Sequence, residues 1–263
     1  MTEALDGFQV WTPRVRARDS DQQIEENIRA VIERGLPELF PPAGQALAIA
    51  CNGPSLVETW ERLKEWSGPI WALNGAHDWL LARGIPVTAS VIMDSIMHEE
   101  SRCCTPRPGI TYYVSSGAGP RVVDRICDLA GRGSVRVFHC GGGGAHAIDP
   151  SRFWVPNGST VGVTSVVLAH GLGYRTLHMF GFDASLKDGE YHPGEAAPEG
   201  ITPCEILSNG RVFASLPGYA AQAAEMTEVL RHIPNLNLIL HGDGLMQHHL
   251  PRAIENERVK NQL

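Results

Sequence analysis

The chain has 263 residues, of which 43% are hydrophobic and 19% charged, and its formal net charge is −7. This composition excludes a chain that is disordered throughout, and the 28 glycines show no collagen-like period. The excess of 29 acidic over 22 basic residues argues against general attraction to nucleic-acid backbones. The sequence has neither a bilayer-spanning apolar run nor a signal-peptide pattern, so we expect a globular, cytoplasmic protein.

An amphipathic segment precedes the main domain. Its apolar residues recur at helical spacing, at Ile24, Ile28, Val31, Ile32 and Leu36. Two prolines at positions 41 and 42 end the pattern. We therefore expect residues 1–42 to form an N-terminal helical arm on the domain that follows, with an apolar side through which a homo-oligomer can form.

Short apolar runs typical of buried strands alternate with helical patterns from Ala46 onward. The runs cover residues 46–51, 70–74, 87–93, 110–114, 134–138 and 176–180. Helices are expected to begin near Ser55, Ala76, Pro120 and Thr160. This alternation predicts an α/β, Rossmann-like fold, in which a mostly parallel open sheet has helices on both faces and binds ligands at the carboxyl ends of its strands.

The alternation stops between residues 183 and 218, where glycine and proline are frequent. A long aperiodic segment in a compact domain is typical of a functional loop, so we predict a lid-like loop at 183–218 within a catalytic domain over 43–240. A helix at about 219–232 and a strand at 236–240 are expected to follow. The histidines of residues 241–263 match no metal-ligand spacing, so we expect a solvated polar tail there.

The stretch CNGPSL at 51–56 joins the first strand to a helix. A glycine there allows close backbone approach, and a helix start offers free N–H groups to a phosphate. The candidate ligand-binding residues are Asn52, Gly53, Pro54 and Ser55. The alternative interpretation is a capping box, in which Ser55 and Glu58 only initiate the helix.

Two further junctions have the same character. Asn74 ends the second strand, and two strand-end amides close together suit a sugar or a base, although a plain Asn-Gly turn is the alternative. Ser159, Thr160 and Gly162 begin an apolar helix, where they form an anion-binding nest or only a helix cap. The four glycines at 141–144 lack the spacing of a dinucleotide-binding motif and predict a flexible loop.

Two titratable residues are candidates for acid–base chemistry. Asp183 closes the sixth strand, and His192 follows in the aperiodic segment. Histidine titrates near neutral pH, which suits a general base. The alternatives are that Asp183 only caps a turn and that His192 is an exposed bystander.

Four stretches, taken in order, resemble one known superfamily. They are CNGPSL, ALNGAHDWL, the run from Asn157 to Ser185, and DGEYHPGE. The superfamily joins the Maf flagellin glycosyltransferases, the MptE-like 6-hydroxymethylpterin diphosphokinases and the family 42 sialyltransferases, and the chain is similar to its short stand-alone members from phage and prophage genomes. The resemblance covers the region from about residue 45 to about residue 235, and Cys51 replaces the glycine that usually opens the first motif.

The resemblance implies a metal-independent, sialyltransferase-like enzyme. Such an enzyme transfers a sugar from a nucleotide-sugar donor, CMP-linked or another NDP-sugar, to the hydroxyl of an acceptor that the sequence does not identify. By motif match, the resemblance implies that Asn52 and Asn74 contact the donor and that His192 is the catalytic base. Three residues at a helix start are implied to cradle the donor: Ser159, Thr160 and Gly162.

Two alternatives stay open. The diphosphokinase branch transfers pyrophosphate from ATP to a pterin alcohol with Mg²⁺ on carboxylates, for which Asp94 and Asp183 are the candidates here. That branch has an aspartate where this chain has Asn74, which favours glycosyl transfer. The other alternative is a catalytically silent, phage-associated binding or assembly protein of the same fold.

Overall fold

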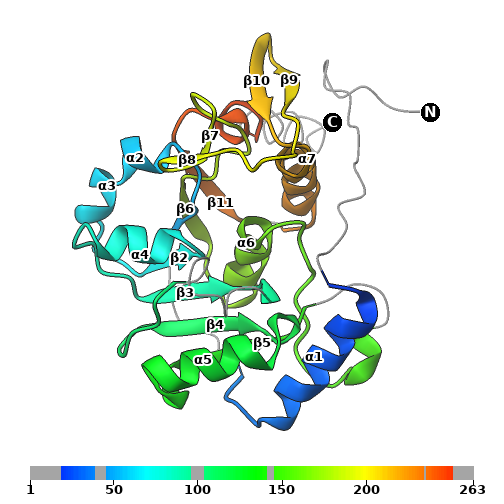
Figure 1. The fold of residues 1–263 in the computed structure, drawn as a ribbon. Coiled ribbons are helices and arrows are strands. Elements are labelled where there is room, and N and C mark those ends of the chain that lie inside the picture. Colours follow the sequence, from blue (N-terminus) through cyan, green and yellow to red (C-terminus); the bar gives the residue numbers. More distant parts are fainter. Residues whose placement is uncertain (1–18, 39–45, 96–103, 141–144, 234, 251–263) are drawn as a thin grey trace.

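The computed structural model describes residues 19–38, 46–95, 104–140, 145–233 and 235–250. Its centre is a seven-stranded sheet in the order β11-β6-β1-β2-β3-β4-β5, with helices on both faces (Figure 1). All neighbouring strands of this sheet are parallel. The predicted α/β, Rossmann-like fold is therefore confirmed.

The strands of the sheet match the predicted apolar runs closely. They are β1 (Ala46–Ala50), β2 (Ile70–Leu73), β3 (Ala89–Ile92), β4 (Thr111–Ser115), β5 (Val135–Phe138), β6 (Thr176–Phe180) and β11 (Asn237–His241). The chain builds the sheet outward from β1 to β5 and then returns to place β6 on the other side of β1. The direction of winding thus changes between β1 and β6, and in open α/β sheets ligands bind at such a point.

The helices divide between the two faces of the sheet. One face carries α1 (Asp21–Glu33), α2 (Leu56–Thr59), α3 (Glu61–Lys64), α4 (Ala76–Leu81) and α5 (Pro120–Ala130). The other carries α6 (Val161–Gly171) and α7 (Pro217–His232). Short 3-10 turns lie at η2 (Ser116–Ala118), η3 (Arg132–Ser134) and η4 (Ala145–Ile148).

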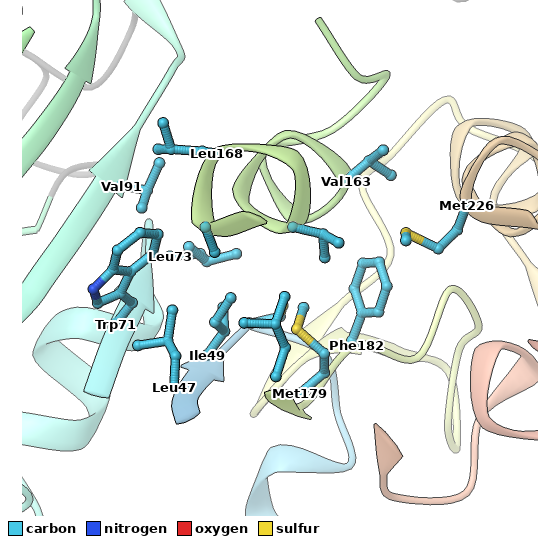
Figure 2. Packing of buried hydrophobic residues seen from close by; sticks show 14 of the residues in the cluster. Leu47, Ile49, Trp71, Leu73, Val91, Val163, Leu168, Met179, Phe182 and Met226 are labelled. Carbon is cyan, nitrogen blue, oxygen red and sulfur yellow. The ribbon is translucent and has the colours of Figure 1, made fainter. Parts of the chain in front are cut away.

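Helices cover both faces of the sheet. Because successive side chains of a strand point to opposite sides, each strand contributes to two separate cores. Along β1, Ala48 and Ala50 belong to the core beneath α4 and α5, whereas Leu47 and Ile49 belong to the core beneath α6. Figure 2 shows the second core, in which Phe182 lies between α6 and α7. This packing holds the segment after β6 close to the start of α6.

The predicted helix of the N-terminal arm is confirmed over α1. Ile28 and Val31 are buried, and α1 packs against η2 and α5. Arg34 donates two hydrogen bonds of 2.8 Å to the carboxylate of Asp124. The apolar side that we expected to serve a homo-oligomer is therefore covered by the chain's own domain. Residues 1–18 and 39–42 of the expected arm lie outside the described residues.

The expected solvated tail is wrong for residues 241–250. His241 ends β11, residues 245–250 are helical, and the side chains of Leu245, Met246 and Leu250 are fully buried. The polar residues between them hide this short apolar pattern in the sequence. Residues 251–263 lie outside the described part of the chain.

The aperiodic segment contains two antiparallel hairpins. They are β7 (Glu190–His192) with β8 (Glu195–Ala196), and β9 (Cys204–Ser208) with β10 (Arg211–Ser215). Asn209 and Gly210 both have positive φ, of 49° and 79°, which is the turn that Asn-Gly favours between strands. That dipeptide was the available signal. No helix of the described residues is long and apolar enough to cross a lipid bilayer.

Candidate functional site

A cleft of about 880 Å³ lies at the carboxyl ends of β1, β2 and β6. All the predicted site residues except Ser55 line it: Asn52, Gly53, Pro54, Asn74, Ser159, Thr160, Gly162, Asp183 and His192. Ser55 is only 3% exposed. The cleft therefore forms where the winding of the sheet changes direction, and it brings together residues from widely separated parts of the sequence.

His192 is held against the end of β1. Its Nδ1 lies 2.6 Å from the backbone carbonyl oxygen of Asn52. A carbonyl oxygen can only accept, so Nδ1 carries the proton and the lone pair of the neutral ring is on Nε2. Burial lowers the pKa of His192 below its usual value, against a smaller opposing effect of the Asn52 carbonyl. The ring thus has the tautomer and charge that a general base requires.

The hairpin of β7 and β8 surrounds this imidazole with polar and aromatic groups. The rings of Tyr191 and His192 have centroids 3.9 Å apart. The hydroxyl of Tyr191 donates a 3.0 Å hydrogen bond to Glu195. The tyrosine therefore packs against the imidazole and is itself positioned by a carboxylate of the same hairpin.

Two amide side chains line the cleft at neighbouring strand ends. Asn74 has φ of 47°, and its Nδ2 donates to Asp94 over 3.4 Å. Its Oδ1 is buried and has no hydrogen-bond partner among the described residues. The amide of Asn52 packs on Gly75, where a Cβ would lie 2.9 Å from Nδ2. Both residues line the cleft, and the Asn74 amide keeps an acceptor that the described chain does not use.

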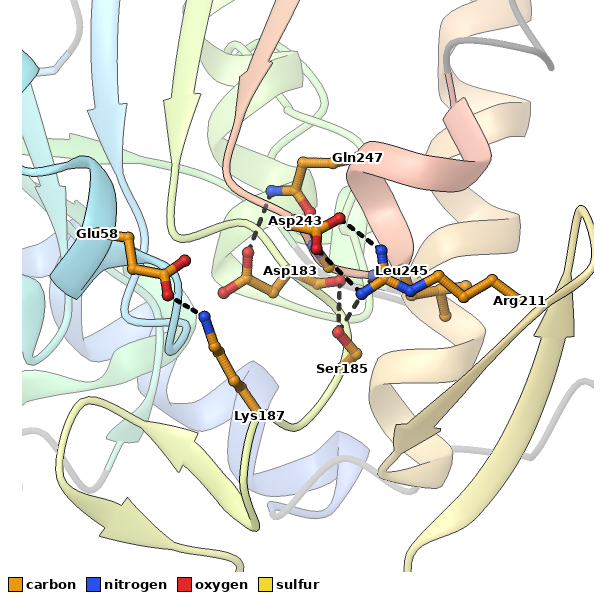
Figure 3. A network of polar contacts seen from close by, with 9 residues as sticks. Glu58, Asp183, Ser185, Lys187, Arg211, Asp243, Leu245 and Gln247 are labelled. Carbon is orange, nitrogen blue, oxygen red and sulfur yellow. Dashed lines mark hydrogen bonds and ion pairs between the residues drawn. The ribbon is translucent and has the colours of Figure 1, made fainter.

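Asp183 is the most deeply buried carboxylate among the described residues of the cleft wall. One of its oxygens accepts from the backbone N–H of Ser55 at 2.8 Å, and the other accepts from the Ser55 hydroxyl at 2.5 Å and from Gln247 at 3.1 Å. Figure 3 shows the Gln247 contact within a network that also pairs Arg211 with Asp243. Burial raises the pKa of Asp183. Its hydrogen bonds tie the CNGPS turn to the end of β6.

The structure corrects two expectations for that turn. Ser55 makes no side-chain cap to α2 and bonds Asp183 instead, while Glu58 pairs with Lys187, so there is no capping box. The N–H of Gly53 donates to Gly181, and that of Ser55 donates to Asp183. These N–H groups are therefore not free for a phosphate, because the end of β6 supplies acceptors that the local sequence does not show.

The start of α6 agrees with prediction in part. Thr160 is the N-cap and accepts from the N–H of Val163 at 3.4 Å, as expected. The N–H and hydroxyl of Ser159, by contrast, both donate to the carboxylate of Glu225 on α7. At Gly162 a Cβ would lie 2.6 Å from the ring of Phe182, so glycine is needed there for packing. The expected nest thus already holds a carboxylate from the chain itself at Ser159.

Sequence reasoning missed two cleft residues on α7. Tyr219 and Gln222 line the cleft and lie three positions apart, on one side of the helix. A signal was available, because Gln222 interrupts a run of alanines that otherwise suits a buried helix face.

The cleft is acidic. Its described lining contains four carboxylates, from Asp78, Asp94, Asp183 and Glu195, and neither lysine nor arginine. Within the described ranges, no group of three His, Cys, Asp or Glu side chains is arranged to hold a metal ion. The glycines at 141–144, expected to form a flexible loop, lie outside the described residues.

Comparisons with known proteins identify a structural neighbour but no family. No protein-family model and no curated protein matches the chain. Among solved structures, the chain is similar to the Maf glycosyltransferase from Magnetospirillum magneticum AMB-1, with a TM-score of 0.60 and 18% sequence identity. The match covers 91% of this chain and 42% of that protein. At this identity the likeness concerns the fold.

Proposed function

We propose that the protein is a glycosyltransferase that uses a nucleotide-sugar donor. The observation that carries the proposal is His192, which lines the cleft, donates its Nδ1 proton to the Asn52 carbonyl and therefore has its lone pair on Nε2. The fold shared with a Maf glycosyltransferase supports the same class of reaction. A general base in a large cleft is compatible with many reactions. The likeness in fold therefore favours glycosyl transfer among these reaction classes.

In the proposed reaction, His192 Nε2 takes the proton of the acceptor hydroxyl. The acceptor oxygen bonds to the anomeric carbon as the bond from that carbon to the donor phosphate breaks, and the nucleotide leaves with the electron pair. The first N–H groups of α6, at Val161 and Gly162, lie at the cleft and have no acceptor within the helix. They are suited to stabilise the charge on the departing phosphate.

The amides at the strand ends complete the proposed donor site. Asn74 Oδ1 can accept from a sugar hydroxyl or a base amine, which would satisfy an otherwise unpaired buried atom. Asn52 offers both a donor and an acceptor beside it. The four carboxylates of the lining repel a ligand that carries several negative charges. The experiment therefore varies the number of phosphates on the ligand and the presence of Mg²⁺.

Calorimetric titration and a nucleotide-release assay test the proposal. The wild type is titrated with CMP, UDP, GDP and ATP and with sugar conjugates of the first three, in EDTA and in Mg²⁺. For a bound donor, release of the nucleotide is then compared between the wild type and His192→Gln. We expect metal-independent binding in both proteins and release slowed about 100-fold or more in the variant.

His232→Gln is the matched control, because His232 lies at the exposed end of α7 and its ring contacts Glu228. Full activity of His192→Gln would refute the assignment of the base. Binding of ATP alone, only with Mg²⁺, would instead indicate a diphosphokinase. Absence of binding by every nucleotide would indicate a catalytically silent protein.

A further inference from the structure

Gln222 is a buried polar residue without a structural partner. Its side chain is 6% exposed and lines the cleft. Its amide makes no hydrogen bond to any described residue, although Asn27 and Gln247, which are also amides, bond to Gly117 and to Asp183. Buried polar groups in folded proteins are almost always paired, so a group that faces a cleft unpaired is available for a ligand.

Tyr219 lies one helical turn before Gln222 and repeats the pattern. It is half-buried, it lines the cleft, and its hydroxyl has no hydrogen-bond partner among the described residues. Burial raises its pKa, with further contributions from the charges of Tyr191 and Glu195, so the phenol stays protonated. Its hydroxyl can therefore donate as well as accept.

The polar groups of these two side chains, the Gln222 amide and the Tyr219 hydroxyl, make no hydrogen bond that stabilises the described fold, whereas the ring of Tyr219 packs against the second core. The Gln222 amide makes no hydrogen bond within the described chain, so an apolar residue of similar size loses no such bond and should be tolerated about as well. The inward face of a helix usually carries apolar side chains, and polar residues that depart from this pattern are typical of functional sites. Their chemistry, an amide and a phenol one turn apart, matches the alternating donors and acceptors of a polyhydroxylated ring.

The position of Tyr219 and Gln222 in the cleft indicates which part of a donor they can contact. Gln222 lies beside Gly162 in the first turn of α6, where a Cβ on the glycine would be 3.0 Å from Nε2. Tyr219 is on the side of Tyr191 and Glu195, the hairpin that carries His192. Figure 1 shows α7 beside α6. The pair therefore lies between the proposed phosphate position at α6 and the proposed base.

We infer that Tyr219 and Gln222 form a subsite that binds the hydroxyl groups of the transferred sugar and does not contact the nucleotide. This inference rests on the proposed function. In that reaction the sugar lies between the departing phosphate and the base, which is where these two side chains meet the cleft.

The test separates sugar recognition from nucleotide recognition. Three pairs of probes are titrated by calorimetry: CMP and CMP-N-acetylneuraminate, UDP and UDP-N-acetylglucosamine, and GDP and GDP-mannose. For each pair, the ratio of the two Kd values measures what the sugar adds. In the wild type, we expect the sugar to tighten binding in one pair. Gln222→Leu should reduce that ratio about tenfold and leave the Kd of the nucleotide within about twofold.

Tyr219→Phe, which removes only the hydroxyl, should reduce the ratio in the same direction. Gln22→Leu, on α1 and outside the cleft, is the matched control. The melting temperature of Gln222→Leu should equal or exceed that of the wild type, which shows that the variant folds. An unchanged ratio, no tightening by any of the three sugars in the wild type, or an equal loss for nucleotide and conjugate, would overturn the subsite. A wild type that binds none of the probes would overturn the proposed function as well.

Discussion

The Nδ1 atom of His192 lies 2.6 Å from the backbone carbonyl oxygen of Asn52, although the two residues are 140 positions apart. The acceptor belongs to the main chain, so the tautomer of the imidazole does not depend on the Asn52 side chain. Asn52 therefore has two separable parts, a carbonyl that orients His192 and an amide that lines the cleft.

This separation predicts the behaviour of Asn52→Ala. The variant keeps the carbonyl and loses the amide, so donor affinity should fall about tenfold while the pH–rate profile stays unchanged. Burial lowers the pKa of His192 below 6.5, so the base stays neutral at pH 6.5. The rate of nucleotide release should therefore begin to fall only at a pH below 6.5. Nucleotide release measured at several pH values checks both points.

Asn237→Ala, on the exposed start of β11, is the control for Asn52→Ala. An acid limb that moves in Asn52→Ala, with the control unchanged, would show that the side chain also sets the state of His192.

The stability of the fold should decrease in mild acid because of His241. Burial, together with the positive charges of His178 and Arg62, lowers the pKa of His241 from 6.5 to about 4. The unfolded chain therefore binds a proton at a higher pH than the native chain does. Stability from this group is complete above pH 6.5 and is lost as the pH falls toward 4.

Thermal unfolding at pH 7 and pH 5 measures this effect. We expect a lower melting temperature at pH 5, and a smaller decrease in His241→Gln than in the wild type. His232→Gln serves again as the control. Equal decreases in all three proteins would assign the acid sensitivity to other groups.

Asp183 should matter more to the stability of the cleft wall than a surface carboxylate does. Asp183→Ala leaves the N–H and hydroxyl of buried Ser55 without their acceptor and removes a contact of Gln247. We expect the free energy of unfolding to fall by about 2–4 kcal/mol. Urea denaturation measures it, with Asp128→Ala on the exposed side of α5 as the control. A loss no larger than in the control would contradict the structural role.

Gly162 should resist even a small substitution. In Gly162→Ala the new Cβ would lie 2.6 Å from the ring of Phe182, so the core between α6 and α7 must shift, at a cost of about 1–3 kcal/mol. Gly218→Ala on α7 meets no atom within 4 Å and should be neutral or slightly stabilising. Chemical denaturation of the two variants compares them directly, and equal stabilities would show that the core adapts without cost.

Most of the fold could be predicted from the sequence because its signals are local. Each strand of the sheet is a short apolar run, and the helices near Pro120 and Thr160 begin with a residue suited to a helix start. The hairpin at Asn209 had a local signal as well, but the surrounding glycines and prolines hid it. The helix at 245–250 was missed because its apolar residues are few and lie among polar ones.

The site residues could be selected from the sequence because strand ends in such a fold face a common edge. The roles of these residues could not be predicted, since their hydrogen-bond partners come from distant segments of the sequence. Ser55 resembles a helix cap but bonds Asp183, and Ser159 resembles an anion site but holds Glu225. Gln222 interrupts a run of alanines, but only the structure shows that it lines the cleft.

By itself, the sequence determined the α/β architecture and the set of strand ends that carry polar residues, since apolar periodicity and turn residues act over a few positions. Only the tertiary structure decided which hydrogen bonds those residues make, because the winding of the chain places β6 beside β1 and brings β7 to the end of β1. His192 acquires its tautomer, and Asp183 its burial, from that contact between distant segments.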